Sequence, residues 1–163
     1  MVLHWGLCSQ PAVFVDRLAG SRPWRDGIRG EELTAEALQK LERFGWKAFH
    51  GLEFETTHIF DIDHTVIGPG GLFAVETKMA NGVWTASKSR KRLWDAVAQA
   101  RSGADRIEKL LNRLVSRGSV RPVVVVWGEL DVHEPLPETV EGVPVMHGRD
   151  LASWLSGQAA LLD

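Results

Sequence analysis

A tight turn between two alternating segments is the feature that most constrains how this chain can fold. Gly68-Pro69-Gly70-Gly71 consists of residues that interrupt regular structure and favour turns. Residues 58–67 before it and 72–79 after it alternate apolar and polar side chains, which is typical of strands with one buried face. The sequence therefore predicts an antiparallel hairpin whose midpoint lies between Pro69 and Gly70.

The register of this hairpin predicts where its charged side chains lie. Pairing that is symmetric about the midpoint places Asp63 opposite Glu76 and Asp61 opposite Lys78. Cross-strand partners share a face of a sheet, as do residues two apart on one strand, so we expect all four on one face. The other face carries His64, Thr77 and the apolar residues Phe60, Ile62, Val66, Phe73 and Val75.

Three carboxylates and a lysine on one patch of a sheet have a chemical consequence. Like charges a few ångströms apart raise one another's pKa, and a hard divalent cation such as Mg²⁺ relieves the repulsion. A lysine beside a metal ion can orient or deprotonate a water molecule and stabilise charge on a phosphate. The patch therefore suits phosphodiester hydrolysis, and a solvated polar face without a chemical role is the structural alternative.

The remaining segments alternate between helical and strand-like patterns. Residues 1–29 are expected to be irregular with one short element, and helices are predicted over 31–44, ended by Gly45, over 91–116 and over 150–155. Further strands are predicted at 46–54, 83–85, 122–127 and 143–146, with a loop over 129–142. This order of elements predicts an α/β fold with a mixed sheet.

Basic side chains are concentrated in one part of a chain whose formal net charge is only −2. Residues 88–121 contain ten basic and three acidic side chains, so this segment is positive while the remainder is acidic. A local basic face on an acidic body suits a protein that holds a polyanion at one place. A solvated helix face is the alternative explanation.

Cysteine content and hydropathy exclude several classes of protein. The single Cys8 excludes a disulfide framework within the chain and a multi-cysteine zinc site. No apolar run approaches the roughly 18 residues of a membrane span, and the N-terminus lacks the pattern of a secretory signal. We therefore expect a cytoplasmic protein without membrane contact, and the 163 residues are expected to form one domain.

Several short motifs occur in a fixed order along the chain. They are Gly27-x-x-Gly30-Glu31, Ile62-Asp63-His64-x-Val66-x-Gly68-Pro69, Gly71-x-Phe73-x-Val75-Glu76-Thr77-Lys78, Asn81-Gly82 and Ala98-Gln99-Ala100. Together they resemble the nuclease-related domain (NERD), which is similar to the restriction-endonuclease-like superfamily with its Asp…Glu-x-Lys signature. The resemblance spans residues 27–127, which leaves 1–26 and 128–163 as peripheral extensions.

The resemblance implies a fold, an activity and a set of site residues. The fold would be a restriction-endonuclease-like mixed sheet flanked by helices, and the activity would be metal-dependent cleavage of DNA rather than RNA. Asp63 and Glu76 would bind Mg²⁺ or Mn²⁺, and Lys78 would be the catalytic lysine. Glu31 would complete the acidic cluster, and Gln99 would line the site.

Partners follow from the same interpretation. Part of the basic segment is expected to contact the nucleic-acid backbone without reading its sequence. The residues expected to make these contacts are Lys88, Arg90, Lys91, Arg92 and Arg101. A homodimer or a second protein partner is compatible with the sequence.

Two other functions compete with a nuclease. The first is a catalytically inactive module that keeps the fold for binding nucleic acid or protein. The second is a haloacid-dehalogenase-type phosphatase, because residues 60–66 resemble the first motif of that family. That family requires a helical crossover after the motif, and crossovers between parallel strands take a dozen or more residues. The tight turn after Ile67 therefore argues against a phosphatase.

Overall fold

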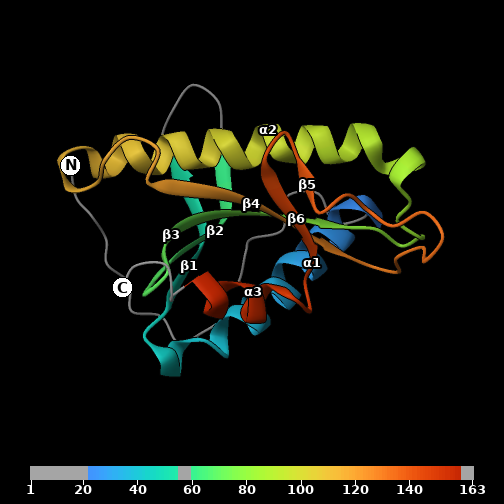
Figure 1. Ribbon diagram of the computed structural model, residues 1–163, viewed down its shortest axis with the longest axis horizontal. Coiled ribbons are helices and arrows are strands. Elements are labelled where there is room, and N and C mark those ends of the chain that lie inside the picture. The colour runs from blue at the N-terminus through green and yellow to red at the C-terminus, as the bar shows by residue number, and fades with distance from the viewer. Residues whose placement is uncertain (1–21, 55–59, 159–163) are drawn as a thin grey trace.

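The computed structural model describes residues 22–54 and 60–158, and in these ranges six strands form one mixed sheet (Figure 1). The strands are β1 (Lys47–Phe54), β2 (Phe60–Gly68), β3 (Gly71–Met79), β4 (Val120–Trp127), β5 (Thr139–Val140) and β6 (Val143–His147). Their order across the sheet is β1-β2-β3-β4-β6-β5. β1, β2 and β3 are antiparallel neighbours, β3 to β4 and β4 to β6 are parallel, and β5 to β6 is antiparallel. The mixed α/β architecture predicted from the sequence is therefore confirmed.

Helices cover both faces of this sheet. α1 (Arg22–Gln39) and α3 (Leu151–Gln158) pack on one face, and α2 (Ala86–Leu111) runs across the other (Figure 1). β4 alternates between the two sides, because Val123 and Val125 pack with α1 and α3 whereas Val124 and Val126 pack with α2. This strand is buried on both faces, as its continuous apolar run predicts.

The β2–β3 hairpin has the register that symmetric pairing predicts. His64 lies opposite Val75, and the pairing continues without a slip to Gly68 opposite Gly71. The recorded ladder between the two strands ends at His64, so the predicted pairs of Asp63 with Glu76 and Asp61 with Lys78 lie beyond its end. On the Phe60 side of His64, β2 stays paired with β1, whereas β2 and β3 separate.

This separation corrects the predicted faces of β2. Val66 packs with α1 and α3 as expected, but Ile62 packs with Ala104 and Ile107 of α2 on the opposite side. Gly51 of β1 lies level with the change of face and has a φ of +58°, a conformation that glycine adopts at low cost. The predicted placement of Ile62 on the same face as Val66 was therefore wrong, because β1 and β2 change the faces of their side chains at this level.

α1 is longer at its start and shorter at its end than predicted. It begins at Arg22, so Gly27 and Gly30 lie inside a helix rather than in an irregular segment. It ends at Gln39 and is followed by the short 3₁₀ helix η1 (Glu42–Phe44), which Gly45 terminates with a φ of +84°. The buried side of this segment carries Ala37, Leu38 and Leu41, whereas Phe44, at the end of the predicted helix, is 57% exposed.

The segment at 83–85 is not a strand. Trp84 forms a single parallel bridge to Leu130, and Thr85 caps α2 by accepting a hydrogen bond from the backbone N of Lys88 at 3.2 Å. α2 therefore begins at Ala86 rather than at residue 91 and ends at Leu111, before the 3₁₀ helix η2 (Asn112–Leu114). A threonine N-cap favours this earlier start.

Residues 128–158 contribute to the same sheet and core. β6 pairs with β4, and the predicted loop over 129–142 contains the short β5. Leu151 and Leu155 of α3 are fully buried against the sheet. Within the described ranges, no helix is both long enough and apolar enough to cross a membrane.

Candidate active site

One pocket of about 280 Å³ lies between α2 and the part of the sheet where β2 and β3 separate. Its lining residues come from three elements and are Asp61, Ile62 and Asp63 of β2, Glu76 and Lys78 of β3, and Gln99, Gly103 and Arg106 of α2. The pocket thus contains the predicted metal ligands, the predicted catalytic lysine and the predicted helix glutamine. Asp61, which the hairpin register places on the acidic patch, also lines the pocket, whereas Ile62, Gly103 and Arg106 were not predicted to belong to the site.

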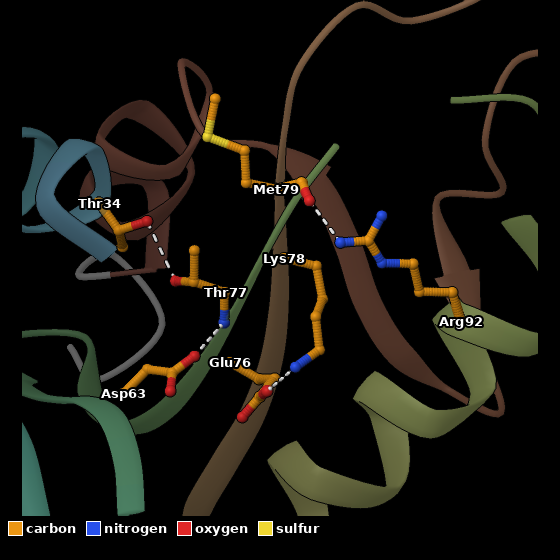
Figure 2. Close-up of polar contacts among 7 residues, drawn as sticks. All are labelled: Thr34, Asp63, Glu76, Thr77, Lys78, Met79 and Arg92. Carbon is orange, nitrogen blue, oxygen red and sulfur yellow. Dashed lines mark hydrogen bonds and ion pairs between the residues drawn. The ribbon is translucent and has the colours of Figure 1, made fainter. Parts of the chain in front are cut away.

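Asp63 is held by the backbone of the neighbouring strand. Its Oδ2 accepts a hydrogen bond from the backbone N of Thr77 at 2.7 Å (Figure 2). The carboxylate thus binds the amide of β3 just beyond the last recorded backbone pair of the hairpin. Burial raises the pKa of Asp63, and the negative charge of Asp61 raises it further. The Thr77 N–H and the nearby Lys78 ammonium oppose this shift.

Glu76 and Lys78 form a close ion pair on β3. Lys78 Nζ lies 2.5 Å from Glu76 Oε1, and both side chains are largely enclosed (Figure 2). Burial raises the pKa of Glu76 to about 7, and Asp63 raises it in the same direction. The ion pair with Lys78 lowers this pKa but does not outweigh the burial. Full ionisation of the acidic cluster is therefore unfavourable in the absence of a cation. A bound cation would remove this penalty.

Glu31 approaches the same cluster from α1. Desolvation raises its pKa to about 7, followed by the charges of Asp63 and Asp61, while Lys78 lowers it. Its side chain is nevertheless exposed and is not among the residues that line the pocket. The adjacent Glu32 has the smallest influence on Glu31 and pairs at 3.4 Å with exposed Arg29. Of the two neighbouring glutamates, Glu31 is thus the one in electrostatic contact with the pocket.

A buried threonine fixes α1 against the strands that carry the site. Thr34 Oγ1 donates to the Gly30 carbonyl at 3.0 Å and lies 3.0 Å from Thr77 Oγ1 (Figure 2). The same oxygen accepts a hydrogen bond from Trp127 Nε1 at 2.8 Å. These bonds join α1, β3 and β4 directly beside Glu31 and Glu76. Sequence reasoning missed Thr34, and its only signal was a polar residue on the buried stripe of an amphipathic helix.

Gly30 allows this close approach of α1 to β3. A Cβ atom at Gly30 would lie 3.0 Å from the Cβ of Met79 and 3.2 Å from Cγ2 of Thr77. Both distances are shorter than ordinary van der Waals contact, so a larger side chain would require a shift of Met79, of Thr77 or of the helix that carries Glu31. Gly30 therefore has a packing role next to the site.

The five basic residues predicted to contact nucleic acid do not share one surface. Successive helical residues are about 100° apart, so Lys88 and Arg92 lie on the side of α2 that carries Gln99. Arg92 donates to the Met79 carbonyl beside the site (Figure 2). The other three basic residues have different surroundings. Lys91 pairs with Asp95 at 2.6 Å, and Arg101 pairs with Glu141 at 2.6 Å. Arg90 lines a separate apolar pocket with Trp94.

A pair of histidines lies outside the pocket. His64 is buried on the α1 side of the sheet, and its Nδ1 lies 2.7 Å from Nδ1 of His50 on β1. Burial lowers the pKa of His64 to about 3, and the neighbouring His50 lowers it further, so the ring is neutral at physiological pH. His64 therefore has a structural place in the sheet rather than a position in the pocket.

The donor set of the pocket fits a hard divalent cation. Asp63 and Glu76 offer carboxylate oxygens, which Mg²⁺ and Mn²⁺ prefer. Across residues 22–54 and 60–158, no three histidine, cysteine, aspartate or glutamate side chains converge as a ready-made metal cluster. A cation held by these two carboxylates would complete its coordination with water and substrate oxygens, which is the usual arrangement for Mg²⁺.

Comparison with known proteins assigns the chain to a class. The mixed sheet flanked by helices is the restriction-endonuclease-like fold, and the chain belongs to the nuclease-related domain (NERD) family, whose model matches residues 26–127. The crystal structure of a protein of unknown function, AF1548, is similar with a TM-score of 0.43 and 12% identity. That similarity covers 72% of this chain and 56% of the other. No curated protein matches.

Proposed function

We propose that this chain is a divalent-metal-dependent nuclease that hydrolyses phosphodiester bonds, with DNA favoured over RNA as the substrate. The observation that carries the proposal is the single pocket that gathers Asp63, Glu76, Lys78 and Gln99 from β2, β3 and α2. Membership in a nuclease-related family supports the same activity.

Asp63 and Glu76 would hold Mg²⁺ or Mn²⁺ in this pocket. When bound, the cation supplies a water of lowered pKa and neutralises charge on the scissile phosphate. Asp63 is pre-oriented for this role, because the Thr77 N–H fixes one of its oxygens. Glu31 of α1 would add a further carboxylate, whose charge interacts with those of Asp63 and Asp61.

Lys78 would position the attacking water and stabilise the charge that develops on the phosphate. Its ammonium group is held within the pocket by Glu76 at 2.5 Å, so its location is set before substrate arrives. Gln99 would donate from α2 to the substrate strand. Lys88 and Arg92, on the same side of α2 as Gln99, would contact backbone phosphates beyond the pocket, and such contacts weaken steeply as salt rises.

The experiment that tests this function is a cleavage assay on labelled plasmid, single-stranded DNA and RNA with Mg²⁺, Mn²⁺ or EDTA. We expect metal-dependent cleavage that Glu76→Ala and Lys78→Ala abolish. Glu138→Ala and Lys109→Ala remove the same charges from exposed positions outside the pocket and should cleave as the wild type does. Wild-type protein that binds nucleic acid but never cleaves it would replace the nuclease with the inactive binding module.

The adjacent glutamates of α1 provide a second, internally matched test. Glu31→Gln should lower cleavage, because it removes a carboxylate in electrostatic contact with Asp63. Glu32→Gln changes the neighbouring residue in the same way but affects only an exposed pair with Arg29. Equal activity of the two variants would remove Glu31 from the site.

A further inference from the structure

The second cation of the pocket has no role in the proposal above. Lys78 enters from β3 and contacts Glu76, whereas Arg106 enters from α2 on the opposite wall. Arg106 lies two helical turns after Gln99, so the two side chains leave the helix on the same side and about 10 Å apart along its axis. The side chain is half-buried, and its Nε donates weakly to Ser102 Oγ at 3.5 Å within the same helix.

The charges of the pocket define what Arg106 can do. Asp61, Asp63 and Glu76 carry three negative charges when ionised, and Lys78 is already paired with one of them. A bound divalent cation and Lys78 would meet part of the substrate's charge from the side of the sheet, and Arg106 places a further positive charge on the helix wall. A guanidinium group matches a phosphate with two parallel hydrogen bonds, a geometry that an ammonium group does not offer.

The pocket of about 280 Å³ is lined by Arg106 of α2 on one wall and by Asp63 and Glu76 of the sheet on the other. A phosphate that sits in the pocket over the two carboxylates therefore lies next to Arg106.

We propose that Arg106 binds the scissile phosphate and stabilises its developing negative charge, with Lys78 on the opposite side. This inference rests on the proposed nuclease function and adds a catalytic residue to it. Gln99 and Arg106 then bracket the scissile group from α2, and the carboxylates hold it from the sheet. A purely structural Arg106, tied to neighbouring side chains, is the competing explanation.

The test compares Arg106→Ala, Arg106→Lys and Arg113→Ala in steady-state cleavage of a labelled oligonucleotide with Mn²⁺. Arg113 is the matched control, because it is an exposed arginine just beyond α2 and does not line the pocket. We expect Arg106→Ala to lower kcat about 100-fold, as removal of one charge-stabilising donor does. Arg106→Lys should recover part of that loss, and Arg113→Ala should cleave as the wild type does.

Two further measurements separate this role from a structural one. Mn²⁺ binding by calorimetry should be unchanged in Arg106→Ala, because the carboxylates remain. The slope of log Kd for the oligonucleotide against log salt should fall in magnitude by about 0.7 to 0.9, the loss of one phosphate contact. Loss of Mn²⁺ binding with an unchanged salt slope and no recovery by lysine would overturn the proposal.

The outcomes for Arg106 and for the nuclease are distinguishable. Cleavage by Arg106→Ala at the rate of Arg113→Ala would overturn the role of Arg106 while the nuclease stands. If the wild type binds without cleaving, the nuclease fails, and a smaller salt slope in Arg106→Ala would still support a phosphate contact. If the wild type neither cleaves nor binds the oligonucleotide, both are refuted.

Discussion

Glu76→Gln should stabilise the metal-free fold at alkaline pH. Glu76 has a pKa raised from 4.5 to about 7, chiefly by burial, and its side chain is 8% exposed. Its native form therefore binds a proton more tightly than the unfolded chain does, so folding stability is lost as pH rises from about 4.5 through 7. At about 1.4 kcal/mol per pKa unit, the ionised carboxylate destabilises the native state by up to about 3 kcal/mol above pH 7.

Removing that carboxylate removes this loss of stability. The free energy of unfolding of Glu76→Gln should exceed that of the wild type by up to about 3 kcal/mol at pH 8 and equal it at pH 4. The gain already includes the broken pair with Lys78, because that pair contributes to the shifted pKa. Such a gain is a large part of the roughly 5–15 kcal/mol that stabilises a domain.

The assay is urea unfolding in EDTA at several pH values, followed by the fluorescence of the buried Trp46 and Trp84. Only the difference between variant and wild type isolates Glu76. His64 acts in the opposite direction, because its lowered pKa makes stability rise with pH between about 3 and 6.5. Exposed Glu138→Gln is the control. A Glu76→Gln variant no more stable than wild type at pH 8 would refute the reasoning.

Three further predictions concern the surroundings of the site. Gly30→Ala should destabilise the protein by about 1 kcal/mol. Overpacking at 3.0 Å from Met79 costs about 1–3 kcal/mol, whereas the higher helix propensity of alanine returns about 1 kcal/mol. A rise in the midpoint of urea unfolding would contradict this prediction. Thr34→Val should lower stability by about 1–3 kcal/mol in thermal unfolding, because Trp127 Nε1 is left without its acceptor; unchanged stability would exclude this hydrogen-bond role. Arg101→Ala should leave the affinity for nucleic acid and the salt dependence of that affinity unchanged in anisotropy titrations. The reason is that Arg101 pairs with Glu141 on the side of α2 opposite Gln99. Arg92→Ala, on the same side as Gln99, should bind nucleic acid more weakly.

Local sequence signals were sufficient for the central elements of the fold. The Gly68–Gly71 turn determined the hairpin register, and the continuous valine run identified β4 as a strand covered on both sides. Regular alternation of side chains within β3 also places Glu76 and Lys78 in one pocket. These features depend on neighbours in sequence or on one strand pair, so a pattern of period two predicts them.

Features that depend on distant contacts were missed or misplaced. The change of face before Ile62 lies level with a positive φ at Gly51 in another strand, and the β2 pattern alone shows neither. The start of α1 was obscured because Gly30 normally weakens a helix, yet here it permits contact with β3. Arg106 enters the pocket only because of the rotation of α2 about its axis relative to the sheet, and no periodicity within α2 specifies which flank faces the site.

The length of the hairpin loop determines which side chains of β3 reach the candidate site. Adding or removing one residue between Gly68 and Gly71 would turn every side chain of β3 to the opposite face. Val75 and Thr77 would then face α2, and the acidic and ammonium groups of Glu76 and Lys78 would enter the apolar cluster that contains Leu38 and Leu41. The number of residues between the two carboxylates that we propose as metal ligands, Asp63 and Glu76, is therefore constrained. A relative of this chain that keeps every acidic residue but changes the interval would need a compensating bulge to remain competent.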